Sequence, residues 1–449
     1  MCIDRNKLNG LLASESEHFI QANPTSKALF ERAGKTLPRG VPMPWMSEWA
    51  SPFPLFIEHA RGAHVRDVDG HDYVDFCLGD TGALFGHSPE PVAAAIADQA
   101  SRGYSYMLPT EDAIRVGEAL QQRFKLPYWQ FAMTATDANR FAIKLARAVT
   151  GRSLIAVFDG GYHGSLDETL VHLHDGRMQP LATNIGPGVD PQLTTRVVDF
   201  NDLEGLEAVL KNEDIACLLC EPVLTNNGLV FPEPGFHSAV RELTEQYGTL
   251  LVVDETHTIC AGPGGATEVL SLAPDLITIG KPLSGGIPSA VYGFSEAVGD
   301  RVNHWLANQE SFVTGIGGTL SGNALSMRAM RTCLEQVMTE QNYQSMTTNA
   351  ARLVKAVQTI IDEFKLPWGI ARFGARIEYR FHPGIPRNAR EATAHHDAEL
   401  EKLFRLFFLN RGIMLTIFYN VALVAPDTTA RDIDRHGEVF REFVERLVG

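Results

Sequence analysis

The sequence of 449 residues contains no long apolar run, little cysteine and no excess of positive charge. No apolar stretch approaches the roughly 20 residues that a membrane-spanning helix needs. Its 39 basic and 54 acidic side chains give a formal net charge of −15. This charge disfavours phosphate backbones and anionic lipid surfaces as partners, because they are negative too. We therefore expect a protein that binds neither nucleic acid nor membranes.

The beginning of the sequence and its cysteines carry equally few signals. Asp4, Arg5 and Lys7 are not followed by the apolar block of a secretory leader. The cysteines are dispersed, as is typical of reduced cytoplasmic proteins, and no set of them has the paired spacing of a zinc site. The six are Cys2, Cys77, Cys217, Cys220, Cys260 and Cys333. We expect a cytoplasmic protein with neither disulfides nor a metal site.

Two fingerprints of nucleotide binding are also absent. There is no Gly-x-x-x-x-Gly-Lys segment and no Gly-x-Gly-x-x-Gly after a strand, so NTP and dinucleotide sites lose support. Between about residues 90 and 330, helical segments instead alternate with short, continuously apolar stretches. Such stretches are typical of parallel strands that helices cover on both faces. The predicted strands are Leu154–Phe158, Ala216–Cys220, Leu250–Val253 and Leu276–Ile279.

The flanking regions have different patterns. Residues 1–60 read as irregular, with clustered prolines, and a hairpin with an Asp69-Gly70 turn follows. Near the other end, Arg376–Phe381 alternates as a strand and Asp432–Leu447 reads as an amphipathic helix. The predicted fold class is α/β, a mainly parallel sheet with helices on both faces plus a smaller α+β domain. The predicted boundaries are 1–76 and 336–449 for the small domain and 77–335 for the large domain.

Reactive side chains directly follow the four predicted strands. Asp159 to Gly164 follow the first strand, Glu221 the second, Asp254 to His257 the third and Lys281 the fourth. Ligands of parallel α/β sheets bind beyond the carboxyl ends of the strands. We therefore expect these side chains to meet at one rim of the sheet.

Lys281 and Asp254 are the most informative of these residues. A lysine at the end of a buried strand is unusual, and a Schiff base between its amine and a carbonyl would explain it; otherwise it is a surface lysine just past a strand. Asp254 could hold a cationic ring nitrogen, or it could be a structural acid or a helix N-cap.

Two segments rich in small and hydroxyl residues precede predicted helices. The segment 131–139 contains Ala135 and Thr136, and unpaired N–H groups at a helix start suit an anion, although capping by threonine is the simpler explanation. The segment 317–323 contains Thr319, and could hold phosphate or be only a tight loop. With the lysine, the ring acid and an aromatic plate from Tyr162, these features together describe a site for pyridoxal 5'-phosphate.

With these motifs in place, the sequence resembles the class III aminotransferases, the fold-type I pyridoxal-phosphate enzymes. The resemblance runs from about residue 25 to the C-terminus and is closest to the branch of glutamate-1-semialdehyde aminomutase and β-amino-acid transaminases. It rests on Ile279-Gly280-Lys281-Pro282, Val253-Asp254-Glu255 and Gly161-Tyr162-His163-Gly164, and on N-terminal matches such as Asp67-Val68-Asp69-Gly70.

The resemblance implies a role for each matching position. Lys281 is similar to the Schiff-base lysine, Asp254 to the pyridinium acid, and Tyr162 with His163 to the ring-stacking segment. Ala135 and Thr136 are similar to the phosphate cup, and Glu221 to the glutamate that supports the site. Thr319 is similar to the threonine that reaches the phosphate in the neighbouring subunit. This implies a homodimer with shared active sites.

Three positions depart from the family pattern. The usual Ser-Gly-Thr-Glu-Ala cup reads Thr134-Ala135-Thr136-Asp137-Ala138, which keeps the backbone N–H groups. Thr256 replaces the valine that packs on the ring, and His257 adds an ionisable group that could tune the cofactor or contact substrate. The segment 78–82 lacks the aromatic residue expected in the aminomutase, which favours a transaminase.

We therefore predict an aminotransferase, a transferase that moves an amino group from a small-molecule donor to a keto acid through the Lys281 Schiff base. The alternatives are a glutamate-1-semialdehyde-type 2,1-aminomutase or an amino-acid epimerase on the same scaffold, and a non-catalytic binding protein. Arg39 or Arg376 could clamp the carboxylate of the substrate, because a guanidinium pairs with it through two hydrogen bonds; Arg380 is a further candidate. Each could equally be a solvated surface arginine.

Overall fold

The computed structural model describes residues 3–311 and 313–449, so Cys2 lies outside the described residues. The chain divides into two compact units. Unit 1 contains the residues up to Pro89, Gln344–Gly384 and His395–Gly449, and unit 2 contains Glu90–Tyr343 and Ile385–Ala394. The sequence prediction put these boundaries after residues 76 and 335. It also missed the short return of 385–394 to unit 2, where Arg390 pairs with Asp199 and Arg387 with Glu233.

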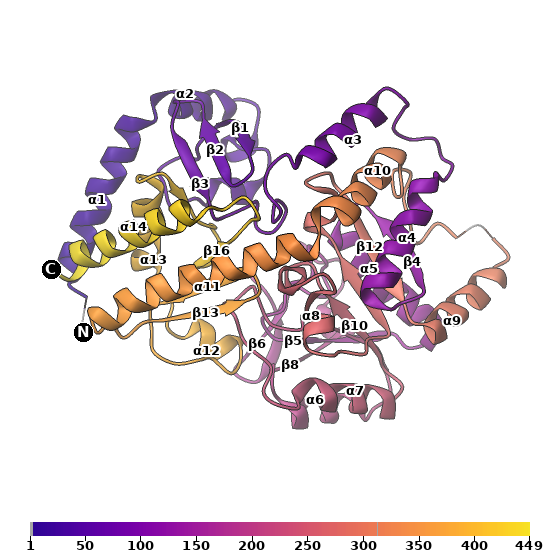
Figure 1. Ribbon diagram of the computed structural model, residues 1–449. Coiled ribbons are helices and arrows are strands. Elements are labelled where there is room, and N and C mark those ends of the chain that lie inside the picture. Colours follow the sequence, from indigo (N-terminus) through magenta and orange to yellow (C-terminus); the bar gives the residue numbers. More distant parts are fainter. Residues whose placement is uncertain (1–2, 312) are drawn as a thin grey trace. The chain divides into compact units, whose positions relative to one another are not determined.

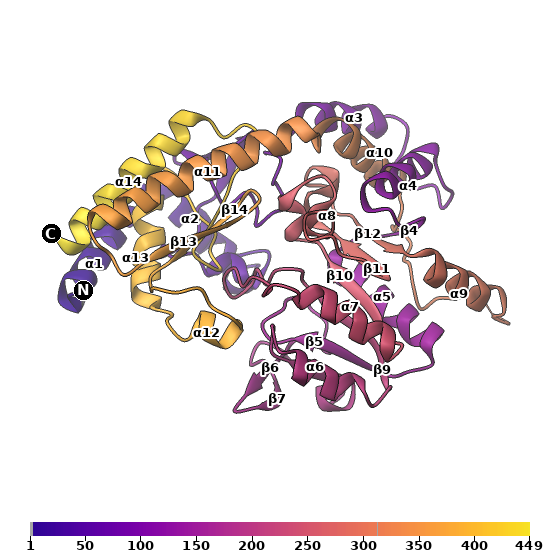
Figure 2. The same ribbon diagram turned by 60° about the horizontal axis from the view of Figure 1, so that its bottom comes forward.

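Unit 2 is built on a seven-stranded sheet in the order β4-β12-β11-β10-β9-β5-β8 (Figures 1 and 2). Only β12 runs antiparallel to its neighbours, so the sheet is mainly parallel, as predicted. The strands are β4 (Tyr128–Ala132), β5 (Leu154–Phe158), β8 (Thr195–Val198), β9 (Ile215–Cys220), β10 (Leu250–Asp254), β11 (Leu276–Ile279) and β12 (Ala290–Phe294). The four strands predicted from apolar runs are thereby confirmed to within one residue at either end.

The sheet of unit 2 is covered on both faces, because every residue of its central strands is buried. Helix α5 supplies much of the core through Ala138, Phe141 and Leu145, and α6 and α7 lie side by side (Figure 2). The helices are α3 (Glu90–Ala100), α4 (Glu111–Phe124), α5 (Ala135–Thr150), α6 (Leu203–Leu210), α7 (Phe236–Gln246), α8 (Gly265–Val269), α9 (Glu296–Ala307), α10 (Ala324–Thr332) and α12 (Ala389–Thr393). A small hairpin of β6 (Val171–His174) and β7 (Arg177–Pro180) lies outside the sheet.

Unit 1 combines two small sheets with long helices. One sheet has the order β1-β2-β3-β15 and the other β13-β14-β16. The strands are β1 (Ile57–Arg61), β2 (His64–Asp67), β3 (Asp72–Asp75), β13 (Gly369–Phe373), β14 (Arg376–Arg380), β15 (Ile413–Met414) and β16 (Val421–Leu423). The predicted hairpin is the β2–β3 pair, and the predicted C-terminal strand is β14, which is buried along its whole length rather than at alternate positions.

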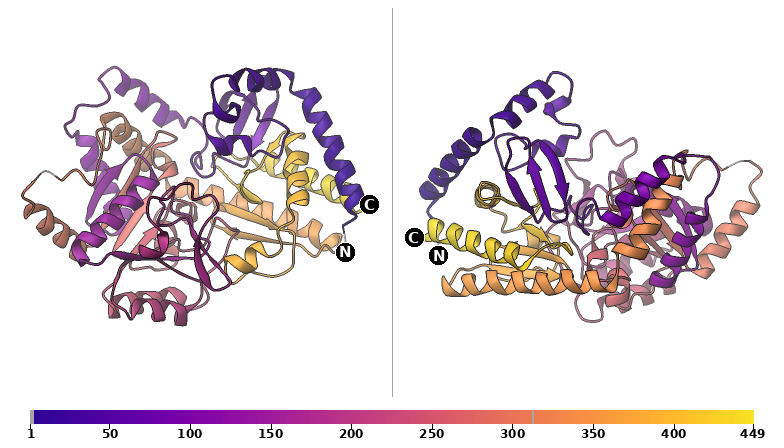
Figure 3. Two further views of the ribbon diagram at one scale, coloured as in Figure 1. Left: turned by 180° about the vertical axis from the view of Figure 1, so that it is seen from behind. Right: turned by 45° about the horizontal axis from the view of Figure 1, so that its top comes forward.

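The main helices of unit 1 enclose an apolar core rich in phenylalanine. They are α11 (Glu340–Glu363), α13 (Ala398–Leu409) and the terminal α14 (Ala430–Val448). Helices α11 and α14 lie side by side (Figure 3), and Phe404, Phe408, Phe440 and Phe443 pack between these elements. Within the described residues, no helix is long and apolar enough to cross a membrane.

The prediction that residues 1–60 are irregular is wrong. Two helices occupy this region, α1 (Arg5–Ala22) and α2 (Pro24–Ala33). Helix α1 buries few side chains, so its sequence has weak apolar periodicity, and it starts where Asp4 accepts hydrogen bonds from two backbone N–H groups. Helix α2 has proline at its first position, where the missing N–H group costs nothing.

Candidate active site at the strand ends of unit 2

Lys281 lies immediately beyond the end of β11. It begins the short 3-10 helix η5 (Lys281–Ser284) with a backbone φ of +53°, a conformation that residues other than glycine seldom adopt. Its Nζ lies 2.7 Å from Nε2 of His257. Such strained backbone is found most often at functional sites, where the surrounding structure compensates for its cost.

Gly280 allows the end of β11 to approach the start of α5. A Cβ atom at this glycine would lie 2.9 Å from Cβ of Ala135 and 3.2 Å from its backbone nitrogen, closer than packed atoms tolerate. Because Gly280 has no side chain, the segment of Gly280 and Lys281 can lie against the N-terminus of α5, where unpaired N–H groups point outward.

Asp254 is the last residue of β10, and its carboxylate is only 3% exposed. Its Oδ2 receives a hydrogen bond from Nδ2 of Asn139 at 2.8 Å and lies 3.0 Å from Nδ1 of His163, while its Oδ1 accepts from the N–H of Thr256. Burial alone would raise the pKa of Asp254, but the hydrogen bonds and the nearby imidazole outweigh burial and lower it. The structure thus keeps a buried carboxylate ionised.

Asn139 is a site residue that the sequence analysis did not single out. It is fully buried on α5, and its amide joins three elements by donating to Asp254 and to the carbonyl of His163 and accepting from the hydroxyl of Thr278. A signal was present in the sequence. Asn139 lies four residues before Ile143, on the apolar side of the helix, where an amide needs partners.

Tyr162 and His163 are adjacent in sequence but differ in their surroundings. The Tyr162 side chain is 46% exposed, whereas His163 is buried with Nδ1 at Asp254. Among the described residues, nothing bonds Nε2 of His163. The sequence analysis grouped both residues as a segment that stacks on a ring. In the structure, the Tyr162 side chain is partly exposed, whereas His163 is buried and contacts Asp254.

Glu221 follows β9 and is buried. Its Oε1 accepts hydrogen bonds from the N–H of Tyr162 and from Nδ2 of Asn226, both at 3.0 Å, and its Oε2 accepts from the N–H and the hydroxyl of Thr225. Burial raises the pKa of this carboxyl above its usual value, although these hydrogen bonds oppose the rise. Glu221 therefore fixes the backbone that carries Tyr162.

The predicted anion site lies at the start of α5. Thr134 is the N-cap and accepts a hydrogen bond from the N–H of Asp137 at 3.1 Å, so capping accounts for this threonine. Ala135 and Thr136 form the first turn beyond it. A Cβ atom at Gly164, which has a φ of +89°, would overlap the Thr136 side chain, so this glycine lets the loop after β5 close over the helix start.

Thr256 and His257 lie between Asp254 and Lys281. The Thr256 hydroxyl accepts a hydrogen bond from the N–H of Gly280 at 3.3 Å, which ties the end of β10 to the end of β11. His257 is 4% exposed and contacts Lys281. The structure therefore gathers the predicted residues that follow β4, β5, β9, β10 and β11 into one cluster.

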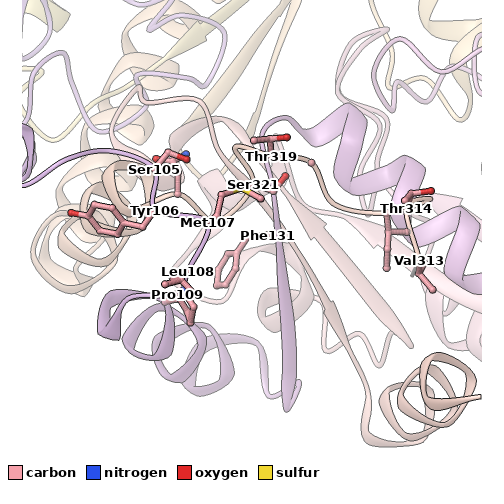
Figure 4. A pocket seen from close by; sticks show the side chains of 15 residues that line it. Ser105, Tyr106, Met107, Leu108, Pro109, Phe131, Val313, Thr314, Thr319 and Ser321 are labelled. Atoms are coloured by element: carbon pink, nitrogen blue, oxygen red, sulfur yellow. The ribbon is translucent and has the colours of Figure 1, made fainter. Parts of the chain in front are cut away.

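Thr319 lies elsewhere in unit 2. It is exposed on the loop between α9 and α10 and lines a pocket of about 620 Å³. Figure 4 shows Ser105 to Pro109 on one side of this pocket, Val313 and Thr314 on the other, and Phe131 between them. Of the described residues, neither Asp254 nor Lys281 lines the pocket, so the structure does not bring Thr319 to the lysine within this chain.

The two arginines predicted to clamp a substrate both belong to unit 1, and their surroundings differ. Arg39 is exposed and pairs with Glu48 at 2.6 Å. Arg376 is 1% exposed on β14, and its Nη1 lies 3.9 Å from Oδ1 of Asp80. Arg380 is also buried and pairs with Glu378. The interpretation as a solvated surface residue therefore fits Arg39 and is wrong for Arg376.

The cluster has the chemistry that pyridoxal phosphate needs. An amine for the aldehyde, an ionised buried acid for the ring nitrogen, an open aromatic face and a helix start for the phosphate all lie at one rim of the sheet. Within the described part of the chain, no group of three or more His, Cys, Asp or Glu side chains could hold a metal ion.

Comparison with known proteins decides the family. Residues 45–401 match the model of the family described as aminotransferase class-III. The chain belongs to this family. Its cofactor is pyridoxal 5'-phosphate, and its fold is that of the fold-type I enzymes, as the sequence resemblance implied.

Similar proteins in the family are named either aminomutases or aminotransferases. A glutamate-1-semialdehyde 2,1-aminomutase of Desulfitobacterium hafniense is 34% identical over 94% of this chain and 98% of its own. The crystal structure of a glutamate-1-semialdehyde-aminomutase from Pseudomonas aeruginosa PAO1 has a TM-score of 0.98 and 43% identity, with all of both chains covered. A β-phenylalanine aminotransferase from Variovorax paradoxus has a TM-score of 0.86 and 26% identity, covering 98% and 97% of the two chains.

Proposed function

We propose that this protein is an aminomutase of the glutamate-1-semialdehyde type, which moves an amino group from carbon 2 to carbon 1 of one substrate. The observation that carries the proposal is the likeness in sequence and fold to relatives with this name, because it spans nearly the whole chain. From the sequence motifs alone, transamination is the first choice and this activity the alternative. The relatives favour it over the first choice.

Transamination between an amino donor and a keto acid is the second candidate. One observation favours it: the segment 78–82, Leu-Gly-Asp-Thr-Gly, lacks the aromatic residue that we expect in the aminomutase. The backbone there is strained, since Leu78, Asp80 and Thr81 all have positive φ values. The segment could therefore be shaped for another substrate.

Both candidates use the same machinery. Pyridoxal phosphate, when bound, supplies an aldehyde for amines and a ring that accepts the electrons left when a C–H proton departs. Lys281 binds the cofactor through Nζ, and when its amine is released, Nζ takes that proton from one carbon and returns it to another. Asp254 holds the ring nitrogen in its protonated form, because an ionised carboxylate in a buried site stabilises the adjacent positive charge.

The remaining residues of the cluster position these groups. His163 and Asn139 hold the Asp254 carboxylate, and Glu221 holds the backbone of Tyr162. The exposed Tyr162 ring would stack on the cofactor. The N–H groups of Ala135 and Thr136 bind the phosphate at the positive end of α5. This local arrangement binds an anion although the chain carries a net charge of −15.

We propose Arg376 over Arg39 as the group that binds the substrate carboxylate. The Arg376 guanidinium is 1% exposed, and a guanidinium with little competing water binds a carboxylate strongly through two hydrogen bonds. Arg39 already has a close partner in Glu48 and is open to water, which weakens any added pair. Replacing Arg376 by lysine should raise KM for a carboxylate substrate with a smaller effect on kcat, and the same change at Arg39 should leave both unchanged.

We also propose that the active enzyme is a homodimer with shared sites. Thr319 is exposed within one chain and is not joined to the lysine cluster of that chain. A second subunit would bring it to the phosphate, as the family resemblance implies.

The test of function is turnover without a second substrate. Purified protein loaded with pyridoxamine phosphate is incubated with glutamate-1-semialdehyde in the absence of any keto acid, and the products are separated and quantified. The aminomutase should convert many equivalents to 5-amino-4-oxopentanoate, and the Lys281→Ala variant should convert none. Turnover that needs a keto acid and releases an oxidised carbonyl product would instead establish transamination. No amino transfer under either condition would overturn both proposals.

A further inference from the structure

The pair formed by His257 and Lys281 is not accounted for by the roles above. The two side chains come from different strand ends, and the distance of 2.7 Å between Nε2 and Nζ is that of a hydrogen bond. An ammonium group and an imidazolium ring are both donors only. The contact therefore requires that one of the two nitrogens offers a lone pair.

The other ionisable groups around this pair have partners of their own. Asp254 is bonded to His163, Asn139 and Thr256. Glu255 accepts hydrogen bonds from Thr258, Ala266 and Thr267, and Glu221 from Tyr162, Thr225 and Asn226. Cys220 and Tyr343 are further buried titratable side chains near Glu255, and Cys260 lies near Tyr343. Burial raises the pKa of the Cys220 thiol and of the Tyr343 phenol well above their usual values, which keeps both groups neutral.

We propose that His257 is a positioning residue that, as a neutral ring, accepts a hydrogen bond from Nζ of Lys281. This inference rests on the proposed role of Lys281 as the group that moves a proton. When the Lys281 amine is released from the cofactor, one of its N–H bonds points to Nε2 of His257. The lone pair of Nζ is therefore directed away from the imidazole ring. When Nζ takes up a C–H proton, the resulting ammonium is stabilised by the same acceptor until the proton is returned. No proton is gained or lost by His257 in this exchange.

Amine labelling of the full-length chain after removal of the cofactor tests the acceptor directly. A reagent specific for unprotonated amines is applied between pH 6 and 11, and modification of Lys281 is followed by peptide mass spectrometry. The His257→Phe variant removes the acceptor that stabilises the unreactive ammonium, so Lys281 should be modified up to about tenfold faster than in the wild type at the same pH, the usual effect of one hydrogen bond to a charged group. The His257→Gln variant keeps an acceptor and should restore the wild-type rate of modification.

A matched control is His237→Gln, which alters a half-buried histidine of α7 bonded to the carbonyl of Pro222 and should leave the labelling profile of Lys281 unchanged. Equal rates of Lys281 modification in wild type and His257→Phe would overturn the inference, and so would failure of His257→Gln to restore the wild-type rate.

Nuclear magnetic resonance of the wild-type histidine rings covers the case in which a variant does not fold. The inference requires that His257 at pH 8 carries its proton on Nδ1 and not on Nε2, with the Lys281→Met variant used to assign the signal; a proton on Nε2 would contradict it. If Lys281 proves not to bind the cofactor, the proposed function fails, whereas the labelling and resonance results still decide the hydrogen bond.

Discussion

At the scale of single residues, the site depends on how a few buried polar groups are satisfied. Lys281 and Asp254 could be singled out as candidates from the sequence, because a charged residue at the end of a continuously apolar strand is an unusual pattern. Asn139 and the contact between His163 and Asp254 could not be, since they depend on which side chains of four separate elements meet. The hydrogen bond between His257 and Lys281 is of the same kind.

Replacing Asn139 by alanine should slow the half-reaction with an amino donor by about tenfold, the usual effect of losing a hydrogen bond to a charged group. Hydrogen bonding lowers the pKa of Asp254, so the carboxylate persists above pH 3.8 and is lost only as the pH falls through its lower folded-state value. Loss of the Asn139 amide donor should raise the pKa of Asp254, so the acid limb of the rate profile should move to higher pH. Stopped-flow spectra across pH measure this.

The control for this variant is Asn184→Ala. Asn184 is also buried and donates to backbone carbonyls, but it lies outside the cluster. Its removal should lower stability without moving the acid limb. An unchanged limb in Asn139→Ala would show that its hydrogen bond does not influence Asp254.

His436 gives a residue-scale prediction in unit 1. It is fully buried against Tyr379, and burial lowers the pKa of His436 to about 3. Because the unfolded chain binds a proton near pH 6.5 and the folded chain does not, this group makes stability fall as the pH drops below 6.5. The slope is about 1.4 kcal/mol per pH unit down to the folded-state pKa.

Urea unfolding at pH 7.5 and pH 5 measures the slope. Between these values, the wild type should lose about 2 kcal/mol more than a His436→Gln variant, which cannot take up the proton. Equal losses would mean that His436 is protonated in the folded chain.

At the scale of helices and strands, whether an element could be predicted from the sequence depended on how much apolar surface it buries. The strands of unit 2 are buried on both faces, so their sequences are continuously apolar and their bounds were predicted almost to the residue. Helices α1 and α2 bury few side chains, leave little periodicity and were missed. The candidate site could be located from the sequence because it lies at the ends of these buried, continuously apolar strands.

The junction of β11 and α5 can be tested with Gly280→Ala. The φ of Gly280 is −129°, which any residue can adopt, so only the missing space opposes the change. The added methyl group meets Ala135 and should push the lysine segment and the phosphate-binding turn apart, weakening cofactor binding by about 1–3 kcal/mol. Fluorescence titration of the cofactor-free protein measures the affinity.

Gly117→Ala is the matched change in open space, since nothing lies within 4 Å of the added atom on α4. It should leave cofactor affinity unchanged. Equal affinity of Gly280→Ala and wild type would mean that the approach of the two elements is not needed for binding.

At the scale of the whole molecule, the composition indicated which partners to exclude but not how the chain assembles. The charge of −15 is compatible with an anionic cofactor if, as we propose, local N–H groups at the start of α5 bind the phosphate, because their effect there exceeds that of the average field. The division into units was visible only in outline, since the return of 385–394 to unit 2 depends on ion pairs between distant segments.

Mixed dimers test whether sites are shared. Lys281→Ala and Thr319→Ala chains should each be impaired alone. If Thr319 acts on the site of its partner, a hybrid of the two contains one intact site, and mixing and reassociation should restore activity toward half of wild type per hybrid. Sites confined to one chain would give no restoration, because the only chain with Lys281 would lack Thr319.

The central claim, that the strand-end cluster around Lys281 is the active site, is tested most directly by fixing the cofactor in place. Protein loaded with pyridoxal phosphate is reduced with borohydride, digested and mapped by mass spectrometry. The account predicts one modified peptide, carrying the cofactor mass on Lys281, and no modified peptide from Lys281→Ala. Modification of a different lysine, or undiminished modification and turnover in Lys281→Ala, would contradict it.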